Sequence, residues 1–202
     1  MPEVIGVEAL RVIGSFAMTQ TCFHDHRGEF AQAFAPTTMA MLKLDTPFKP
    51  VHSNVAWNPW ARTWRGLHYQ VGPFKENKLV MCLEGEAWDF ILDLREGSPT
   101  YGKAEWVALK RPQMDEQKRR VYKSVFIPKG CAHGYLTRLP YTTMLYFTDE
   151  RYAPHYSRTL CRSVLYDQLR DAGADVLLNV LRYDELEMSD KDREASAALP
   201  KL

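Results

Sequence analysis

The sequence predicts a mainly β domain, built as a sandwich or barrel, with short helices at its C-terminal end. Proline and glycine divide roughly the first 160 residues into short segments, as turns between short strands do in an all-β protein. The last forty residues differ, because SVLYDQLRDAG and ADVLLNVLRYDEL carry apolar residues at helical spacing. Gly173 lies between these two segments and is expected to end the first helix.

Several turns and one further helix follow from local signals. AHGYLTR (132–138) and YTTMLYFT (141–148) are separated by Leu139-Pro140, which predicts a hairpin. A turn at Gly85 is expected to join two more strands. PTTMAMLKL (36–44) is expected to form a short helix with its proline in the first turn.

Residue alternation gives two predicted strands distinct faces. In WDFILDLR, four apolar side chains share one side and two carboxylates share the other, with Ile91 between Asp89 and Asp93. In YTTMLYFT, Tyr146 lies on one side with Thr142, Met144 and Thr148. Buried carboxylates need water or partners. If one face of each strand lines a cavity, polar groups converge there, as at the mouth of a small β-barrel.

Composition limits the possible classes. The chain has 202 residues, 46% apolar and 25% charged, as in an ordinary globular domain. A net charge of +1 provides no overall field for nucleic acid, so no nucleic-acid partner is expected. The N-terminal segment has acids and no basic run before an apolar block, so it does not resemble a signal peptide. No apolar run approaches the roughly 20 residues of a membrane helix, so no membrane association is expected.

The four cysteines form no C-x-x-C pair and are widely spaced, at Cys22, Cys82, Cys131 and Cys161. This spacing argues against a zinc knuckle or a redox dithiol. We therefore expect reduced thiols and a cytoplasmic protein.

The stretch RGLHYQ (65–70) places one histidine, His68, among apolar and aromatic residues. It could be a core residue, a metal ligand or a base. No H-x-H motif accompanies it, and the next acid, Glu76, falls in a loop flanked by lysines. His133 has a P-x-G-x-x-H spacing that resembles only the second half of the cupin metal signature, so no metal is expected. Histidine is also the side chain whose ordinary pKa suits proton abstraction near neutral pH.

Other catalytic signatures are missing from the sequence. It contains no G-x-S-x-G elbow, no G-x-x-x-x-G-K loop and no G-x-G-x-x-G fingerprint. Phosphate binding would therefore depend on side chains such as Arg27, Arg65 and Lys78.

Several segments together resemble the dTDP-4-dehydrorhamnose 3,5-epimerases, a family of cupin-fold nucleotide-sugar epimerases. The resemblance spans about residues 8 to 192 and rests on segments in the family's order and spacing: DHRGEF (25–30), SNVAWN to RGLHYQ (53–70), KLVMCLEGEAWDFILDLREGSPTYG (78–102), VFIPKGCAHGYL (125–136), YFTDERYAP (146–154) and SDKD (189–192).

This resemblance implies a double-stranded β-helix, also called a jelly roll or cupin fold, with short C-terminal helices. A single domain is expected over 1–202, with a β body over about 1–160 and a helical cap over about 163–202. The resemblance further implies a homodimer and epimerisation of a dTDP-4-keto-6-deoxyhexose at C3 and C5. No cofactor is expected, because the C4 ketone of the substrate acidifies the neighbouring C–H bonds.

The resemblance also implies roles for individual residues. His68 corresponds to the general base, Asp192 to its paired carboxylate, and Tyr146 to the general acid. Lys78 is the expected cation for the enolate. The remaining correspondences are substrate-binding residues, namely Arg27, Gln32, Asn54, Arg65, Asp89, His133 and Tyr152. From the residues alone, Arg27 could instead form a surface salt bridge, and Asp192 could lie in a solvated turn or helix cap.

The sequence departs from the family at a few places around these residues. His52 stands where the family usually has glutamine, while Gln32 and Ser157 stand where it usually has acids. NPWARTW carries two tryptophans where the family is smaller and more polar. These changes leave open a single-centre epimerase on a related sugar. A metal-dependent cupin and a non-catalytic sugar-binding cupin are the alternatives from other classes.

Overall fold

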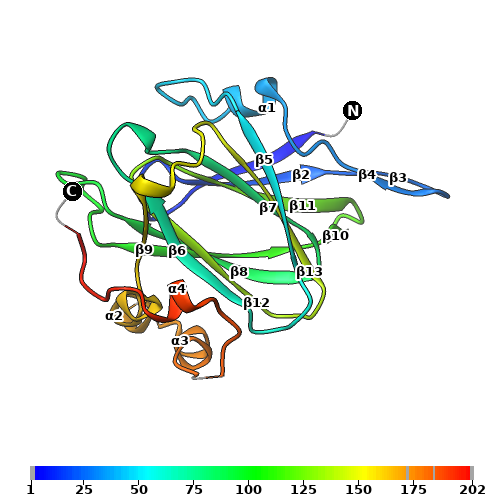
Figure 1. Cartoon of the computed structure of the whole chain (residues 1–202). Coiled ribbons are helices and arrows are strands. Elements are labelled where there is room, and N and C mark those ends of the chain that lie inside the picture. The colour runs from blue at the N-terminus through cyan, green and yellow to red at the C-terminus, as the bar shows by residue number, and fades with distance from the viewer. Residues whose placement is uncertain (1–2, 172, 184, 201–202) are drawn as a thin grey trace.

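Two antiparallel sheets lie face to face, and a layer of helices covers the outer face of one of them (Figure 1). The computed structural model describes residues 3–171, 173–183 and 185–200. In this part of the chain the first sheet has the order β1 (Val4–Ala9), β2 (Phe16–Thr21), β11 (Arg120–Ile127), β7 (Lys78–Glu84), β13 (Thr142–Thr148) and β5 (His52–Asn58), with β10 (Gln113–Met114) beside β11. The second has the order β14 (Ser157–Thr159), β6 (Trp64–Gln70), β12 (Cys131–Thr137), β8 (Glu86–Asp93) and β9 (Ala104–Lys110).

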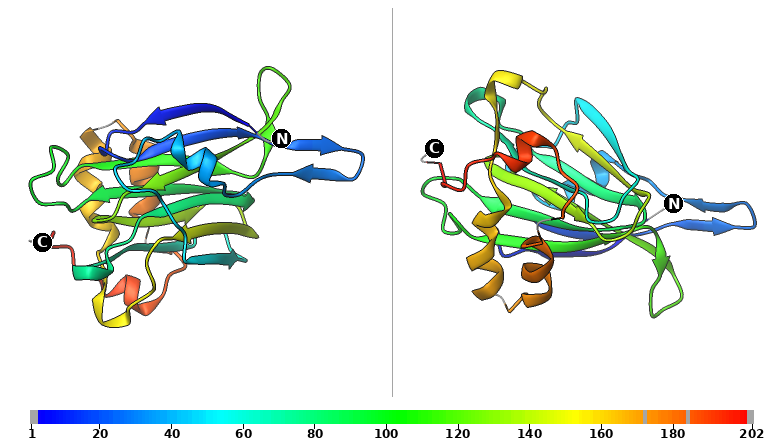
Figure 2. Two further views of the ribbon diagram at one scale, coloured as in Figure 1. Left: turned by 90° about the horizontal axis from the view of Figure 1, so that it is seen from above. Right: turned by 60° about the horizontal axis from the view of Figure 1, so that its bottom comes forward.

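The remaining elements lie outside the two sheets. A hairpin of β3 (Phe23–Asp25) and β4 (Gly28–Phe30) projects from the body (Figure 2). The helices are α1 (Pro36–Ala40), α2 (Tyr166–Asp171), α3 (Asp175–Leu181) and α4 (Asp190–Arg193), and short 3-10 turns span Gly72–Phe74, Pro154–Tyr156 and Arg162–Leu165. The predicted fold class, a mainly β cupin-type sandwich with short C-terminal helices, is confirmed.

Both faces of strand β8 are covered, which accounts for the layered architecture. Its alternate residues Trp88, Phe90 and Leu92 pack with apolar residues of α2 and α3, on the outer face of the second sheet. Ile91 points the other way and packs between the two sheets. Both faces are therefore buried, as the predicted alternation requires, and the helices supply the cover that the outer face needs.

The predicted hairpin at Leu139-Pro140 is wrong. β12 pairs with β6 and β8, whereas β13 pairs with β5 and β7, so the connection crosses from one sheet to the other. The turn at Gly85 also joins strands of different sheets, since β7 and β8 do not pair. A Cβ on Gly85 would approach Thr142 Cα to 2.9 Å, and the glycine has a φ of +79°. Such a close approach between sheets requires glycine.

The C-terminal segments form the expected helices. Gly173, with a φ of +67°, donates its N–H to the carbonyl of Arg170, and the next N–H bonds to Leu169. These two bonds end α2 in a Schellman motif. No helix among the described residues has the length and apolar character to cross a membrane.

Candidate active site

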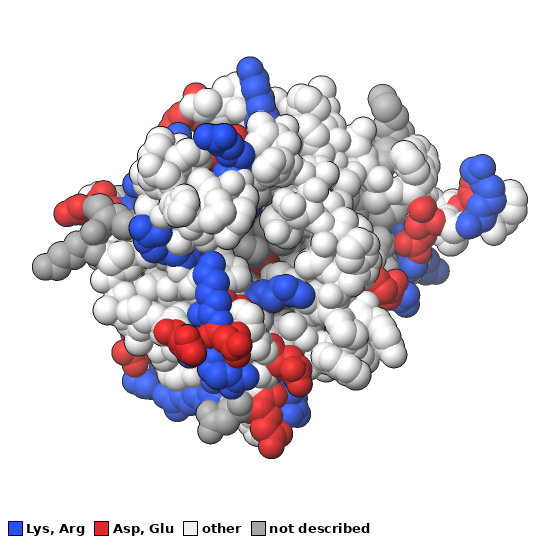
Figure 3. Space-filling model, in the orientation of Figure 1, with Lys and Arg blue, Asp and Glu red and all other residues white. Residues whose placement is uncertain are grey.

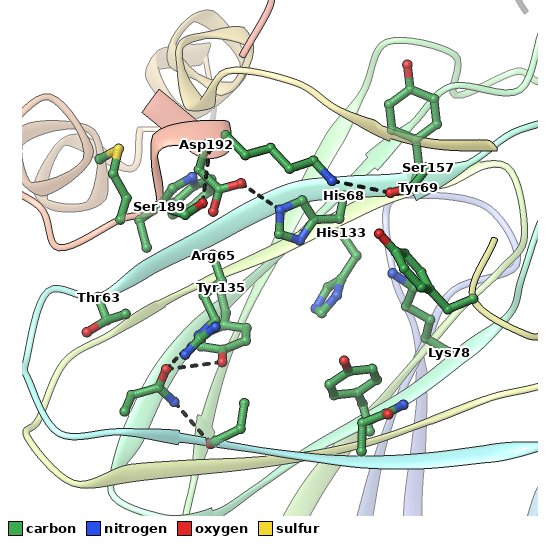
Figure 4. Close-up of a pocket in the computed structure, with 18 of the residues that line it drawn as sticks. Thr63, Arg65, His68, Tyr69, Lys78, His133, Tyr135, Ser157, Ser189 and Asp192 are labelled. Carbon is green, nitrogen blue, oxygen red and sulfur yellow. Dashed lines mark hydrogen bonds and ion pairs between the residues drawn. The ribbon is translucent and has the colours of Figure 1, made fainter. Parts of the chain in front are cut away.

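A cavity of about 800 Å³ opens between the sheets, where β5, β6, β7, β12 and β13 meet α4 (Figure 4). Eight of the residues expected from the resemblance lie in its wall, namely His68, Tyr146, Asp192, Lys78, Asn54, Arg65, His133 and Tyr152. On the face shown in Figure 3, basic side chains border a central hollow, and the basic groups of the wall include Arg65, Lys78 and Lys191.

A bulge in β6 turns both Arg65 and His68 toward the cavity. Residues three apart on a regular strand point to opposite faces, yet both of these side chains line the wall. The register explains it, because Arg65 pairs with Tyr135 and His68 pairs with His133, so β6 carries one extra residue between the pairs. Gly66 occupies the bulge with a φ of +134°, and a Cβ there would lie 2.5 Å from the Cα of Gly134. The glycine of RGLH is thus a requirement of this strand geometry.

His68 is held by Asp192. His68 Nε2 lies 2.6 Å from Asp192 Oδ1, and the aspartate is 3% exposed. Asp192 lies in α4, where Ser189 caps the helix by accepting the N–H of Asp192. The buried carboxylate accepts the Nε2 proton, which leaves the lone pair on Nδ1 for a ligand.

Tyr146 and Lys78 come from the opposite sheet. Tyr146 on β13 pairs with Asn54 on β5 and with Val80 on β7, two residues from Lys78. Burial raises the pKa of Tyr146, the negative charge of Glu76 raises it further, and Arg65 acts in the opposite sense. The tyrosine therefore keeps its proton as a neutral donor at ordinary pH.

His133 is supported from behind by Asp89. His133 Nε2 lies 2.8 Å from Asp89 Oδ2, and Asp89 is fully buried. Asp89 does not line the cavity itself, so it acts on the cavity through His133. Asp89 Oδ1 has no hydrogen-bond partner in the described part of the chain.

Two residues that the sequence did not single out fix the orientation of Arg65. Asn58, 1% exposed, donates its amide protons to the carbonyls of Ala56 and Thr142. Its Oδ1 accepts from Arg65 Nε at 2.8 Å and from the hydroxyl of Tyr135 at 3.3 Å. This leaves the terminal guanidinium nitrogens of Arg65 for an anion. Alternation places Asn58 on the same face of β5 as the expected substrate residue Asn54, but its full burial depends on the strands that pack against it.

Arg27 and Gln32 lie outside the cavity of their own chain. Arg27 is on the projecting β3–β4 hairpin, where it forms an ion pair with Asp25 at 2.6 Å. Gln32 follows β4, and its carbonyl accepts the hydroxyl of Tyr122 at 2.6 Å. Neither residue is brought near His68 by the fold of one chain.

Two of the unusual residues do reach the wall. His52 and Ser157 line the cavity, and Ser157 Oγ accepts from Lys191 Nζ at 3.4 Å. Trp60 also lines the wall and is 62% exposed, which leaves its ring available to a ligand. These residues line the cavity together with His68, Tyr146 and Asp192.

Comparison with known proteins assigns the family. Residues 9–198 match the family described as dTDP-4-dehydrorhamnose 3,5-epimerase. The chain belongs to this family. An epimerase is an isomerase, so the expected enzyme class is confirmed.

Relatives and solved structures agree with this assignment. A dTDP-4-dehydrorhamnose 3,5-epimerase of Mycobacterium tuberculosis (strain CDC 1551 / Oshkosh) is 32% identical over 155 residues, which cover 75% of this chain and 70% of the relative. The structure of the M. tuberculosis rmlC epimerase has a TM-score of 0.75 and 25% identity, covering 96% of this chain and 88% of that one. ChmJ, a 3'-monoepimerase from Streptomyces bikiniensis in complex with dTDP-quinovose, has a TM-score of 0.73 and 24% identity, with coverages of 94% and 86%.

All four residues expected to act in proton transfer line the cavity, namely His68, Asp192, Tyr146 and Lys78. Within the described residues, no three His, Cys, Asp or Glu side chains gather as a metal-binding group.

Proposed function

We propose that this protein is a 3,5-epimerase of a dTDP-4-keto-6-deoxyhexose and acts in deoxysugar biosynthesis. The observation that carries the proposal is the placement of His68 and Tyr146 on facing sheets around one cavity. A sugar ring held between the sheets meets a base on one face and a proton donor on the other. Inversion of a carbon centre needs this arrangement.

The first step is proton removal next to the ketone. His68 Nδ1 takes the proton from a carbon adjacent to the C4 carbonyl, the C–H electron pair forms a double bond from that carbon to C4, and the carbonyl π pair moves onto the C4 oxygen to give an enolate. Asp192 stabilises the imidazolium that results. Lys78, in the same wall, stabilises the negative oxygen.

The second step restores the carbon with opposite configuration. The enolate electrons return to the carbon, which takes a proton from the Tyr146 hydroxyl on the opposite face. The tyrosinate then regains a proton from solvent, and His68 loses one. The ketone supplies the acidity, so the cycle requires no cofactor.

Deuterium exchange tests the proposal directly. The protein is incubated with dTDP-4-keto-6-deoxyglucose in heavy water, and deuterium is counted at C3 and C5. Exchange at both positions with inversion is the expected result, and His68→Asn should abolish it while circular dichroism stays unchanged. Exchange at neither position would contradict the substrate assignment.

A single-centre epimerase is the second candidate. The fold is shared with a 3'-monoepimerase, so the sandwich by itself does not select one carbon or two. His52, Trp60 and Ser157 line the same wall, where a sugar between base and acid can contact them. Exchange at one carbon alone would establish this alternative. Elemental analysis of the same sample tests the metal-dependent alternative, which requires stoichiometric bound metal.

We also propose that the protein is a homodimer in the cytoplasm. Arg27 and Gln32 are expected to contact substrate, yet they lie away from the cavity of their own chain. The hairpin that carries Arg27 projects into solvent with Phe23 and Phe30 more than half exposed, so it can reach a second copy (Figure 1). The free thiols of the four cysteines are compatible with a reducing compartment.

Mixing two inactive variants tests the dimer. Arg27→Ala chains should be weak alone, and His68→Asn chains should be inactive. After co-refolding, mixed dimers should regain up to about half of the wild-type activity per site, because one cavity then has both groups. No recovery would argue that Arg27 does not serve a neighbouring chain.

A further inference from the structure

Glu76 is an acid in the wall of the cavity, in the segment between the turn at Gly72–Phe74 and β7. Its side chain is only 12% exposed, although its lysine-flanked position in the sequence suggested a solvated loop. A buried carboxylate requires partners for both oxygens. Those partners connect it to the proposed catalytic groups.

One oxygen of Glu76 faces Lys78. Glu76 Oε1 lies 3.2 Å from Lys78 Nζ, and the lysine side chain is 9% exposed. Among the described residues, Glu76 is the acid that forms an ion pair with Lys78. An ammonium has three N–H donors, so pairing on one side leaves donors for an oxygen in the cavity.

The other oxygen of Glu76 is tied to β6. Gln70 Nε2 lies 3.1 Å from Glu76 Oε2 and 3.0 Å from the carbonyls of Phe74 and Arg151, and it shares its two protons among these three acceptors. Gln70 Oε1 accepts the N–H of Ala153 at 2.6 Å. Tyr152 lies between Arg151 and Ala153. Glu76 is therefore the central member of a buried chain that links Lys78 to the segment carrying Tyr152.

We propose that Glu76 is a positioning residue that holds the ammonium of Lys78 against the cavity, so that its free donors meet the oxygen on which the enolate forms. The inference rests on the proposed function, because it assigns Lys78 to that oxygen. Without this contact, the flexible side chain of Lys78 would have to be ordered during the reaction. A charge that is already held in place stabilises the transition state more than a charge that must first be ordered. The negative charge of Glu76 also helps to raise the pKa of Tyr146, which keeps the donor protonated.

The carboxylate is required for a chemical reason. Its two oxygens accept from two different donors, Lys78 and Gln70, whereas the amide of a glutamine has one acceptor. Glu76→Gln preserves size but must lose one partner. A role in filling space alone would tolerate this substitution, so the variant separates positioning from packing.

The experiment compares Glu76→Gln with a matched control. Glu86 is 13% exposed and lies 3.6 Å from Lys110, but it is outside the cavity. Epimerisation and deuterium exchange are measured for Glu76→Gln, Glu86→Gln, Lys78→Met and the double variant Glu76→Gln/Lys78→Met, and the Kd for dTDP is measured for each.

The expected result is a loss in kcat without a loss in nucleotide binding. Glu76→Gln should lower kcat by about ten- to a hundred-fold, the scale of a misplaced catalytic group. The Kd for dTDP should stay within about two-fold, and Glu86→Gln should behave as wild type. In the Lys78→Met background, Glu76→Gln should add less than about two-fold, because its effect passes through the lysine. An equal loss in both backgrounds, or a fully active Glu76→Gln, would overturn the inference.

A readout without turnover separates this inference from the proposed function. Proton–nitrogen NMR of lysine ammonium groups should show a protected signal that is absent in Lys78→Met. It should be lost or shifted in Glu76→Gln and unchanged in Glu86→Gln. If the wild type shows this pattern but exchanges no deuterium, the positioning contact stands and the substrate assignment fails. An unchanged Lys78 signal in Glu76→Gln would refute the positioning role.

Discussion

His68 and Asp192 are separated by 124 residues in the sequence, yet His68 Nε2 lies 2.6 Å from Asp192 Oδ1. One residue comes from the middle of a sheet and the other from a four-residue helix near the C-terminus. The contact sets the tautomer of His68 and supplies a buried negative charge to its protonated form. The C-terminal segment therefore completes the site.

Asp192→Asn should lower kcat steeply. The amide can hold the wrong tautomer and carries no charge, and the comparable change in a serine-protease triad costs about 10⁴-fold. We expect a loss of about 10²- to 10⁴-fold in deuterium exchange, measured by NMR. Asp190→Asn, an exposed acid in the same helical turn, is the control and should keep full activity.

Tyr146→Phe should separate the two halves of the reaction. Without the hydroxyl, His68 still removes the proton, and the imidazolium exchanges it with solvent and returns deuterium to the same face, so exchange with solvent deuterium continues. Inversion stops, because no donor remains on the opposite face. Product stereochemistry and deuterium content, followed together, measure this difference. A variant with full epimerisation would show that another group is the acid.

The pH dependence follows from the same tyrosine. Burial, then the charge of Glu76, raises the pKa of Tyr146 above its ordinary value of 10.0. A donor with a raised pKa is protonated below that pKa, and it loses its proton only as the pH rises through that pKa. Epimerisation should therefore show no decline caused by Tyr146 below about pH 10. The pH profile of epimerisation by the wild type, compared with the pH profile of deuterium exchange by Tyr146→Phe, isolates the contribution of this residue.

Asn58→Ala should weaken binding of the nucleotide more than it slows chemistry. Removal of the amide frees Arg65 Nε, and the guanidinium loses its fixed orientation. A hydrogen bond to a charged group is worth about 2 kcal/mol, so the Kd for dTDP should rise about ten-fold or more. Isothermal titration measures this change. In an Arg65→Ala background the same substitution should have little further effect.

Asp93→Asn should make the protein less stable and its stability less sensitive to acid. Burial favours the neutral acid, but hydrogen bonds from Arg95, Ser98 and Thr100 outweigh it and hold the pKa of Asp93 well below 3.8. A lowered folded-state pKa gives stability that is fully present above about pH 4 and is lost progressively as the pH falls from there through the folded-state pKa. The variant leaves Arg95 without its carboxylate, at a cost of about 3 kcal/mol. Urea unfolding at pH 7 and pH 3 measures both effects.

Much of the site could be predicted from the sequence because its residues lie in conspicuous local motifs. His68 and Arg65 fall in RGLHYQ, and Tyr146 falls on a strand face whose alternation is regular. Asp93, one of the two carboxylates expected to need a partner, forms an ion pair with Arg95. Strand faces were predictable because side-chain direction alternates with a period of two, whatever the partner strands are.

The burial of Glu76 and Asn58 could not be predicted from local sequence. Glu76 lies in a loop flanked by lysines and Asn58 lies between two exposed tryptophans, and the burial of each depends on strands that are distant in the sequence. The crossing between β12 and β13 was mistaken for a hairpin because a tight turn has the same local signals whether its strands pair or separate into two sheets.

The sequence by itself predicted the family, the two faces of the strands β8 and β13, and the candidate residues for proton transfer. Local residue types and their periodicity carry that information. Only the tertiary structure decided that Arg65 and His68 share one face, that Asp192 reaches His68, and that Glu76 pairs with Lys78 at 3.2 Å. Those relationships arise from a bulge between strands, the packing of a terminal helix and the burial of a charge, and each of them depends on chain segments that meet only after folding.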